Sequence, residues 1–154
     1  MVHEALTIEP AKNIEEAYAA IVVDQLIFSS PTPKQFFILA VTRNDLYVLS
    51  LAKNDNCEIV GYFLATIVKE ESEIVSLGVV PGMRNMGIGV ALISSLAETA
   101  TGRGAQRLFL EVRRSNSAAL ALYRSTGFKT VGVRCRYYRN PPEDALVMSR
   151  PLET

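Results

Sequence analysis

Apolar residues occur along the chain in strand-like runs and at helical spacing, and these two patterns predict the elements of the fold. The strand-like runs, bounded by turn residues, predict strands at residues 6–9, 46–52, 58–69, 73–80, 106–112, 130–138 and 145–148. The helical period predicts helices at residues 13–26, 34–41, 89–100 and 116–126. The resulting order indicates an α/β fold, an α+β sandwich in which a mixed sheet carries helices on both faces.

Several positions refine the expected helices. Asn13 is expected to cap the first helix, and Gly102 to end the third in a left-handed conformation. Ser115 or Asn116 is expected to cap the last helix. The apolar positions at helical spacing are Tyr18, Ile21, Val22 and Leu26 in the first helix, Leu92, Ile93, Leu96 and Ala97 in the third, and Ala119, Leu122, Tyr123 and Thr126 in the last.

Length and composition exclude several classes of protein. The 154 residues suit one domain, 1–154, and no apolar stretch is long enough to span a membrane. The first ten residues lack the pattern of a secretory signal, which favours a cytoplasmic protein. Cys57 and Cys135 are expected to be free thiols, with a disulfide as the alternative. His3 is the only histidine, so neither a His-based triad nor a His-rich metal site is expected.

Charge is divided unevenly between the two halves of the chain. Residues 1–82 contain 5 Lys or Arg and 11 Asp or Glu, whereas residues 83–154 contain 11 and 5. This asymmetry indicates either that an anion binds the second half or that two solvated faces attract each other. A nucleic-acid partner is not expected, because no recognised motif or Lys/Arg-aromatic stripe is present.

A glycine loop joins the expected strand 73–80 to the expected helix 89–100. It contains Arg84, Gly87 and Gly89 in the spacing R-x-x-G-x-G. Glycines let the backbone approach a ligand, and a helix start adds partial positive charge, so the loop suits a diphosphate. A Walker loop would end in Gly-Lys-Ser/Thr, and a dinucleotide fold would have glycine in place of Leu92. The pyrophosphate of coenzyme A is then the favoured ligand, and a helix start that binds nothing is the alternative.

Glu111 lies alone within the apolar run 108–112. A buried carboxylate is costly unless it has a partner or takes up a proton, and such surroundings suit a general base. In the structural alternative, Glu111 pairs with Arg113 or Arg136. Tyr123 follows twelve residues later and could equally fill the core.

Three further segments carry a family resemblance. Residues 110–123 read LEVRRSNSAALALY, Gly127-Phe128 follows, and residues 136–148 contain RYY and PEDALVM. With R-x-x-G-x-G, the chain resembles the GNAT acetyltransferases, and within them the ribosomal-protein alanine N-acetyltransferases (RimI type) and related protein N-terminal acetyltransferases. The resemblance covers residues 76–152; residues 1–75 agree only in element order and in Val60-Gly61-Tyr62.

The resemblance implies a seven-stranded, mostly antiparallel sheet that splays between its fourth and fifth strands. It implies direct acetyl transfer from acetyl-CoA to a protein N-terminal α-amine, with a ribosomal protein as one candidate acceptor. Glu111 would accept the proton, and Tyr123 would protonate the departing thiolate. The implied cofactor-binding residues are Leu77, Gly78, Val79, Arg84, Asn85, Met86, Gly87, Ile88, Gly89, Val90 and Asn116.

Three aromatic residues are expected to contact the acceptor: Phe28, Tyr137 and Tyr138. Adjacent residues of a strand point to opposite faces, so at most one of the two tyrosines should face the groove. Residues 29–37 would form the opposite wall. An α-amine is about 10% neutral at pH 7 against roughly 0.04% for a lysine, so it needs less help from a base. The alternatives are a small-amine or lysine acceptor, and a non-catalytic acyl-CoA-binding module.

Overall fold

The computed structural model describes residues 5–153, and His3 lies outside them. The elements follow the predicted order, with one short 3₁₀ helix added after the fourth strand. They are β1 (Thr7–Pro10), α1 (Ile14–Ile27), α2 (Lys34–Thr42), β2 (Tyr47–Lys53), β3 (Ile59–Val68), β4 (Glu71–Val79), η1 (Pro81–Met83), α3 (Ile88–Gly102), β5 (Arg107–Arg113), α4 (Ser117–Ser125), β6 (Lys129–Arg139) and β7 (Pro142–Pro151).

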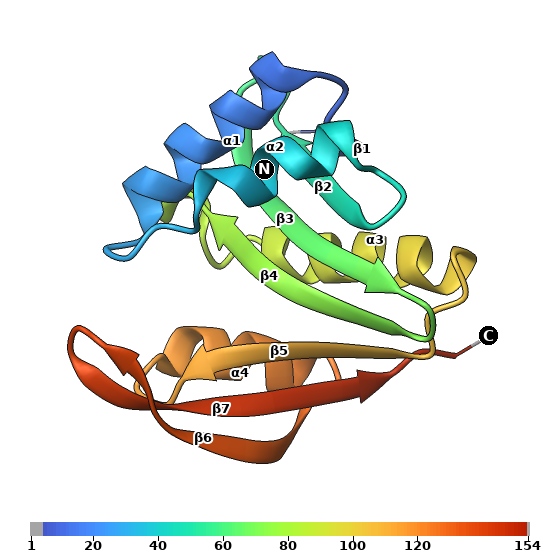
Figure 1. The fold of residues 1–154 in the computed structure, drawn as a ribbon. Coiled ribbons are helices and arrows are strands. Elements are labelled where there is room, and N and C mark those ends of the chain that lie inside the picture. Colours follow the sequence, from blue (N-terminus) through green and yellow to red (C-terminus); the bar gives the residue numbers. More distant parts are fainter. Residues whose placement is uncertain (1–4, 154) are drawn as a thin grey trace.

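The strands form one seven-stranded sheet in the order β1-β2-β3-β4-β5-β7-β6. Neighbouring strands are antiparallel except β4 and β5, which are parallel, and this confirms the predicted mixed sheet. β4 and β5 pair only through Glu71–Ile74 and Arg107–Leu110. Beyond these residues the two strands diverge (Figure 1), so the sheet splays where the family resemblance implied.

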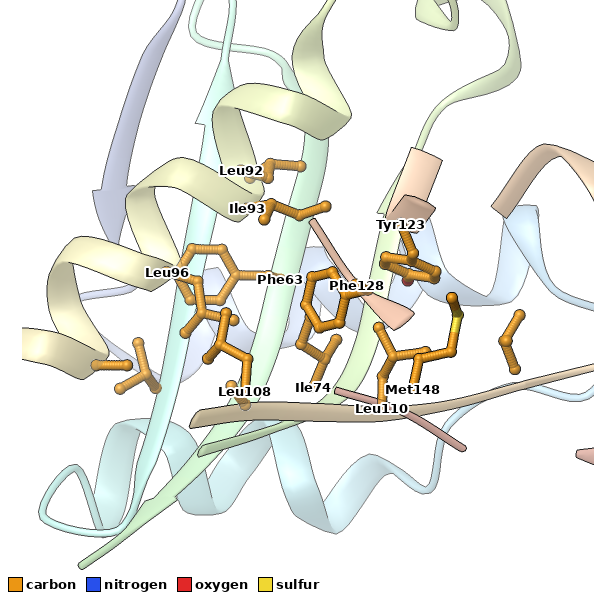
Figure 2. Packing of buried hydrophobic residues seen from close by; sticks show 14 of the residues in the cluster. Phe63, Ile74, Leu92, Ile93, Leu96, Leu108, Leu110, Tyr123, Phe128 and Met148 are labelled. Atoms are coloured by element: carbon orange, nitrogen blue, oxygen red, sulfur yellow. The ribbon is translucent and has the colours of Figure 1, made fainter. Parts of the chain in front are cut away.

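The two faces of the sheet carry separate apolar clusters. Tyr62 and Leu64 of β3 belong to the cluster under α1 and α2, whereas Phe63 belongs to the cluster under α3 and α4. This follows from the alternation of side chains along a strand. Figure 2 shows Leu92, Ile93 and Leu96 of α3 packed near Phe63 and Leu108, with Tyr123 and Phe128 near Leu110 and Met148. The sheet is therefore covered on both sides around β3 and β4.

The predicted apolar face of α1 is largely wrong. Only Ile21 is buried; Tyr18, Val22 and Leu26 are 51%, 54% and 76% exposed. The buried residues of α1 are instead Ala17, Ala20, Ile21, Val23 and Asp24. Alanines allow the helix to approach the sheet closely, and the spacing of the larger side chains could not reveal this choice.

Two helix ends also differ from expectation. α3 continues to Gly102, and the left-handed glycine is Gly104, with φ 93°. Gly102 was predicted as the cap because the helix was expected to end two residues earlier. At α4 the cap is Asn116, whose side chain accepts from the Ala119 N–H at 3.1 Å. Leu120, which was missing from the predicted face, is buried beside Tyr123.

Cys57 and Cys135 are free and exposed. Within residues 5–153, no helix combines the length and the apolar character needed to cross a membrane. The same residues contain no group of three or more His, Cys, Asp or Glu placed to hold a metal ion.

Gly61 of β3 lies where β4 and α3 leave little room for a side chain. A Cβ atom at this position would lie 3.0 Å from the Gly78 carbonyl oxygen and 3.2 Å from Leu92 Cδ1. Backbone cannot give way as a side-chain tip can, so we expect Gly61→Ala to lower the free energy of unfolding by about 1–3 kcal/mol. Gly102→Ala adds a Cβ in open space within a helix and should leave stability unchanged or slightly raised. Urea unfolding of both variants measures the difference, and equal stabilities would contradict the packing argument.

Candidate active site

A cavity of about 390 Å³ lies beside the splay between β4 and β5. It is lined by residues of α1, the α1–α2 loop, β4, β5, α4 and β6. Six predicted site residues line it: Phe28, Leu77, Glu111, Asn116, Tyr123 and Tyr138. Gly78, Val79, Tyr137 and the residues of the glycine loop are not among its lining. The cavity thus brings both proposed catalytic side chains to one place.

Glu111 lies one residue beyond the part of β5 that pairs with β4. Leu110 and Val112 point into the α3–α4 cluster, so Glu111 points to the opposite face. Its side chain is 17% exposed, and Arg134 Nε of β6 lies 3.0 Å from its Oε1. The partner is therefore Arg134 rather than Arg113 or Arg136. This ion pair offsets part of the cost of placing the carboxylate in a cavity.

Tyr137 and Glu73 are two of the groups that respond to the charge of Glu111. The pKa of Tyr137 is raised, chiefly because its hydroxyl hydrogen-bonds the Glu111 carboxylate and also by burial. The pKa of Glu73 on β4 is raised by burial and then by the negative charge of Glu111. Glu111 is thus surrounded by groups that hold protons more tightly than usual, with Arg134 as the neighbouring cation.

Tyr137 and Tyr138 do not lie on strictly opposite faces. Their ring centroids are 5.1 Å apart at an interplanar angle of 86°. The register of β6 shifts between Arg134 and Tyr138, and Arg136 has a positive φ of 51°, which breaks the strand alternation. Tyr138 lines the cavity under the Arg113 guanidinium, 4.2 Å from the ring centroid. Tyr137 lies beneath Arg134 instead.

Tyr123 reaches the cavity from the buried face of α4. It is 7% exposed and packs edge-on against Phe128, with ring centroids 5.5 Å apart (Figure 2). Burial raises the pKa of its hydroxyl, so the side chain stays protonated at neutral pH. A protonated phenol fixed in the wall of a cavity can donate a proton to a basic leaving group.

The last residues of β4 expose main-chain groups to the splay. The Val80 N–H donates to the Val60 carbonyl at 2.9 Å, so hydrogen-bonding positions alternate from there along β4. Because Leu77 and Val79 are the non-bonded positions of this ladder, their N–H and C=O groups point away from β3, toward the gap. Arg84 Nε donates to the Val79 carbonyl at 3.2 Å and ties the glycine loop to the strand end.

The glycine loop is exposed and turns sharply before α3. Asn85 and Gly87 have positive φ angles of 61° and 82°. Gly87 is the N-cap of α3 and has no side chain to bond the first-turn N–H groups, which leaves these donors for another acceptor. Of the other predicted loop residues, Ile88 is buried, while Met86 and Val90 are 63% and 45% exposed. A Cβ at Gly89 would lie 2.9 Å from Leu122 Cδ2, so this glycine lets α3 pack against α4. An uncapped, exposed helix start of this kind fits an anionic phosphate group.

Sequence reasoning missed three residues near the site. Arg134 carries no signal in sequence that would single it out among the many arginines of the second half. Glu73 lies in an alternating strand and looks like an ordinary exposed acid. Asp24 could have been noticed, because it is an isolated acid among the apolar residues 20–27, and it proves to be 1% exposed.

Comparisons with known proteins agree with this geometry. The sequence profile of the acetyltransferase (GNAT) family matches residues 14–128. The [ribosomal protein bS18]-alanine N-acetyltransferase of Escherichia coli K12 is 32% identical over 136 residues, which cover 87% of this chain and 90% of that protein.

Two solved structures are similar over nearly their whole length. The crystal structure of the ribosomal-protein-S18-alanine N-acetyltransferase from Escherichia coli has a TM-score of 0.85 at 28% identity, covering 97% of this chain and 96% of that one. Arabidopsis thaliana NAA60 in complex with acetyl-CoA has a TM-score of 0.84 at 20% identity, covering 96% and 99%, and shares the fold. The chain belongs to the acetyltransferase (GNAT) family, whose members use acetyl-CoA.

Proposed function

We propose that this protein transfers an acetyl group directly from acetyl-CoA to the N-terminal α-amine of a protein. The observation that carries the proposal is that Glu111 and Tyr123 line one cavity, at the splay of β4 and β5. The Escherichia coli relative is named for acetylating an alanine of ribosomal protein bS18, so a ribosomal protein N-terminus is the first candidate acceptor.

The two side chains divide the proton transfers between them. When bound, acetyl-CoA supplies an acetyl group on a thioester. Glu111 accepts the proton that the attacking amine must lose, and Tyr123 donates a proton to the departing sulfur. The Val79 N–H, directed at the gap, donates a hydrogen bond where negative charge develops on the carbonyl oxygen. No covalent link to the enzyme is required, and neither Cys57 nor Cys135 lines the cavity.

The cofactor would be held by main-chain groups along the open edge of β4 and at the start of α3. Leu77 and Val79 would pair with the pantetheine arm, while the main chain of Gly78, between them, faces β3. The exposed turn would receive the pyrophosphate through the N–H groups of its residues Arg84, Asn85, Met86, Gly87, Ile88, Gly89 and Val90. Asn116, which lines the cavity, would contact the cofactor from the start of α4.

The acceptor would enter between the α1–α2 loop and β6. Phe28 and Tyr138 line the cavity from these opposite sides, and Tyr137 lies just outside it, beside Arg134. Aromatic rings at the mouth suit the apolar parts of a peptide backbone and its first side chain. A peptide therefore finds contacts on two walls, whereas a small amine would use only the carboxylate.

Incubation with acetyl-CoA and a panel of peptides that differ in their first residue tests the proposal. Mass spectrometry with fragmentation distinguishes α-acetylation from acetylation of an internal lysine. We expect α-acetylation, including of peptides that begin with alanine. Modification of small amines or lysines alone, with no peptide α-amine acetylated, would reject the peptide acceptor.

Glu111→Gln removes the proton acceptor but keeps the size of the side chain. We expect kcat to fall by about 10²–10⁴-fold, the usual contribution of general base catalysis, while acetyl-CoA still binds. Steady-state kinetics and calorimetry measure the two quantities. Arg136→Gln, which changes an exposed residue of β6, is the control and should change kcat little. Unchanged turnover in Glu111→Gln would exclude the assigned base.

Gly87→Ala tests the glycine loop. Because Gly87 has φ 82°, an alanine there favours a free loop that has left this left-handed conformation. Binding must then restore it at a cost of about 1–2 kcal/mol, which predicts acetyl-CoA affinity weaker by about 5- to 30-fold. Gly82→Ala in the same loop adds a Cβ in open space at a position without a positive φ, and should bind normally. Equal affinities of the two variants by calorimetry would show that the turn does not hold the cofactor.

A further inference from the structure

A buried carboxylate lies behind the cavity, outside the residues assigned to the reaction. Asp24 of α1 is 1% exposed. Its Oδ2 accepts from the Thr32 N–H at 2.8 Å, and its Oδ1 accepts from the Thr32 hydroxyl at 3.0 Å and from the Ser76 hydroxyl at 3.2 Å. The Tyr62 hydroxyl donates a further, short hydrogen bond to Oδ1. Four donors from three segments therefore meet one acid.

The α1–α2 loop depends on this carboxylate for its position. The bonds from Thr32 to Asp24 are the only hydrogen bonds that residues 29–32 form with the rest of the described chain. Pro31 and Pro33 lack N–H groups and cannot add any. Ser29, Ser30 and Thr32 nevertheless line the cavity. All the hydrogen bonds that tie residues 29–32 to the rest of the described chain thus go to a single side chain.

The other bonds of Asp24 lead to the strand that opens the sheet. Ser76 also lines the cavity, and it follows Val75, the residue of β4 that has no partner in β3. The Tyr62 hydroxyl of β3 contacts both Asp24 and Ser76. Burial and the hydrogen bond to Asp24 raise the pKa of Tyr62, so its hydroxyl remains a donor. Asp24 consequently links the loop to the part of β4 where the splay begins.

A buried carboxylate is costly to remove from water, and the hydrogen bonds from Thr32, Ser76 and Tyr62 offset this cost. The carboxylate provides a fixed distance between loop and strand, which apolar contacts alone do not specify. We propose that Asp24 is a positioning residue that sets the acceptor groove by clamping Thr32 to Ser76. The inference rests on the proposed function, because it assigns the α1–α2 loop to the acceptor peptide and not to the cofactor.

The test compares Asp24→Asn and Thr32→Val with Thr32→Ser and Asp45→Asn. Asparagine keeps the shape of Asp24 but turns one acceptor into a donor, and valine removes the Thr32 hydroxyl at similar volume. Asp45 pairs with Arg43 on the surface, so Asp45→Asn is the matched control. Thr32→Ser keeps both bonds to Asp24 and should behave as the wild type does.

We expect Asp24→Asn to raise KM for the peptide by about tenfold, equivalent to about 1.4 kcal/mol, with the acetyl-CoA KM and kcat changed by less than about twofold. Thr32→Val should do the same to a smaller extent, and the double variant should resemble Asp24→Asn alone, because both act on one contact. An acetyl-CoA KM that rises as much as the peptide KM, or an unchanged peptide KM, would overturn the clamp.

Hydrogen exchange by mass spectrometry examines the loop without a substrate. Residues 29–36 should exchange faster in Asp24→Asn and Thr32→Val and not in Asp45→Asn, with thermal unfolding confirming that each variant is folded. Unchanged exchange would also refute the clamp, whatever the kinetics. A wild-type enzyme that acetylates no peptide would reject the proposed function separately, since the exchange result does not depend on it.

Discussion

The site depends on the short pairing between β4 and β5. Four residues of each strand form the parallel ladder, after which both strands continue as strands but no longer with each other. Main-chain groups normally satisfied in a central sheet are then left facing a gap, and unpaired groups of this kind are costly if buried without a partner. The splay is therefore stable only because it is open to solvent or to a ligand with complementary polar groups. An extended amide chain, such as a pantetheine arm, offers donors and acceptors of this kind.

The pair formed by Glu111 and Arg134 gives the gap its electrostatic character. The Arg134 side chain is 59% exposed, so its attraction for the carboxylate is weakened by solvent and salt. The carboxylate therefore has a partner that an incoming substrate can displace at modest cost. The carboxylate also raises the pKa of Tyr137, and it adds to the larger effect of burial in raising the pKa of Glu73.

The sequence predicted the fold well because local patterns and connectivity agree. The β-rich segments of residues 58–80, the polar turn between them and the glycine turn before α3 are short-range signals, and they placed the strands and the helix to within a few residues. The left-handed glycine was placed at Gly102 rather than Gly104, since helix ends are decided by the last hydrogen bonds and not by the apolar pattern. The apolar face of α1 was misjudged because contact with the sheet selected alanines over larger side chains.

Contacts that form only in the folded protein also limited what the sequence could predict about the site. Glu111 and Tyr123 were found through motifs and twelve-residue spacing, and the structure places them on one cavity. The two partners expected for Glu111, Arg113 and Arg136, were wrong, and Arg134 was not considered, because a register shift and a left-handed residue in β6 break the alternation that would assign faces. Contacts made across the sheet, such as those of Asp24 with Ser76 and Tyr62, depend on tertiary registration that no local pattern encodes.

Gly78 is a position where the sequence suggests a role in cofactor binding and the structure shows a role in packing. Its place in the sequence suggests a cofactor contact, yet a Cβ there would lie 2.9 Å from Ile27 Cδ1 and 3.4 Å from Phe28 Cε2. The missing side chain lets the end of α1 lie directly on β4, and this contact brings Phe28 to the edge of the cavity. On this geometry Gly78 acts on the acceptor side of the site through its lack of a side chain, while its main chain faces β3 and not the gap. The glycine therefore shapes the groove first, and any contact with the cofactor would come from its neighbours Leu77 and Val79.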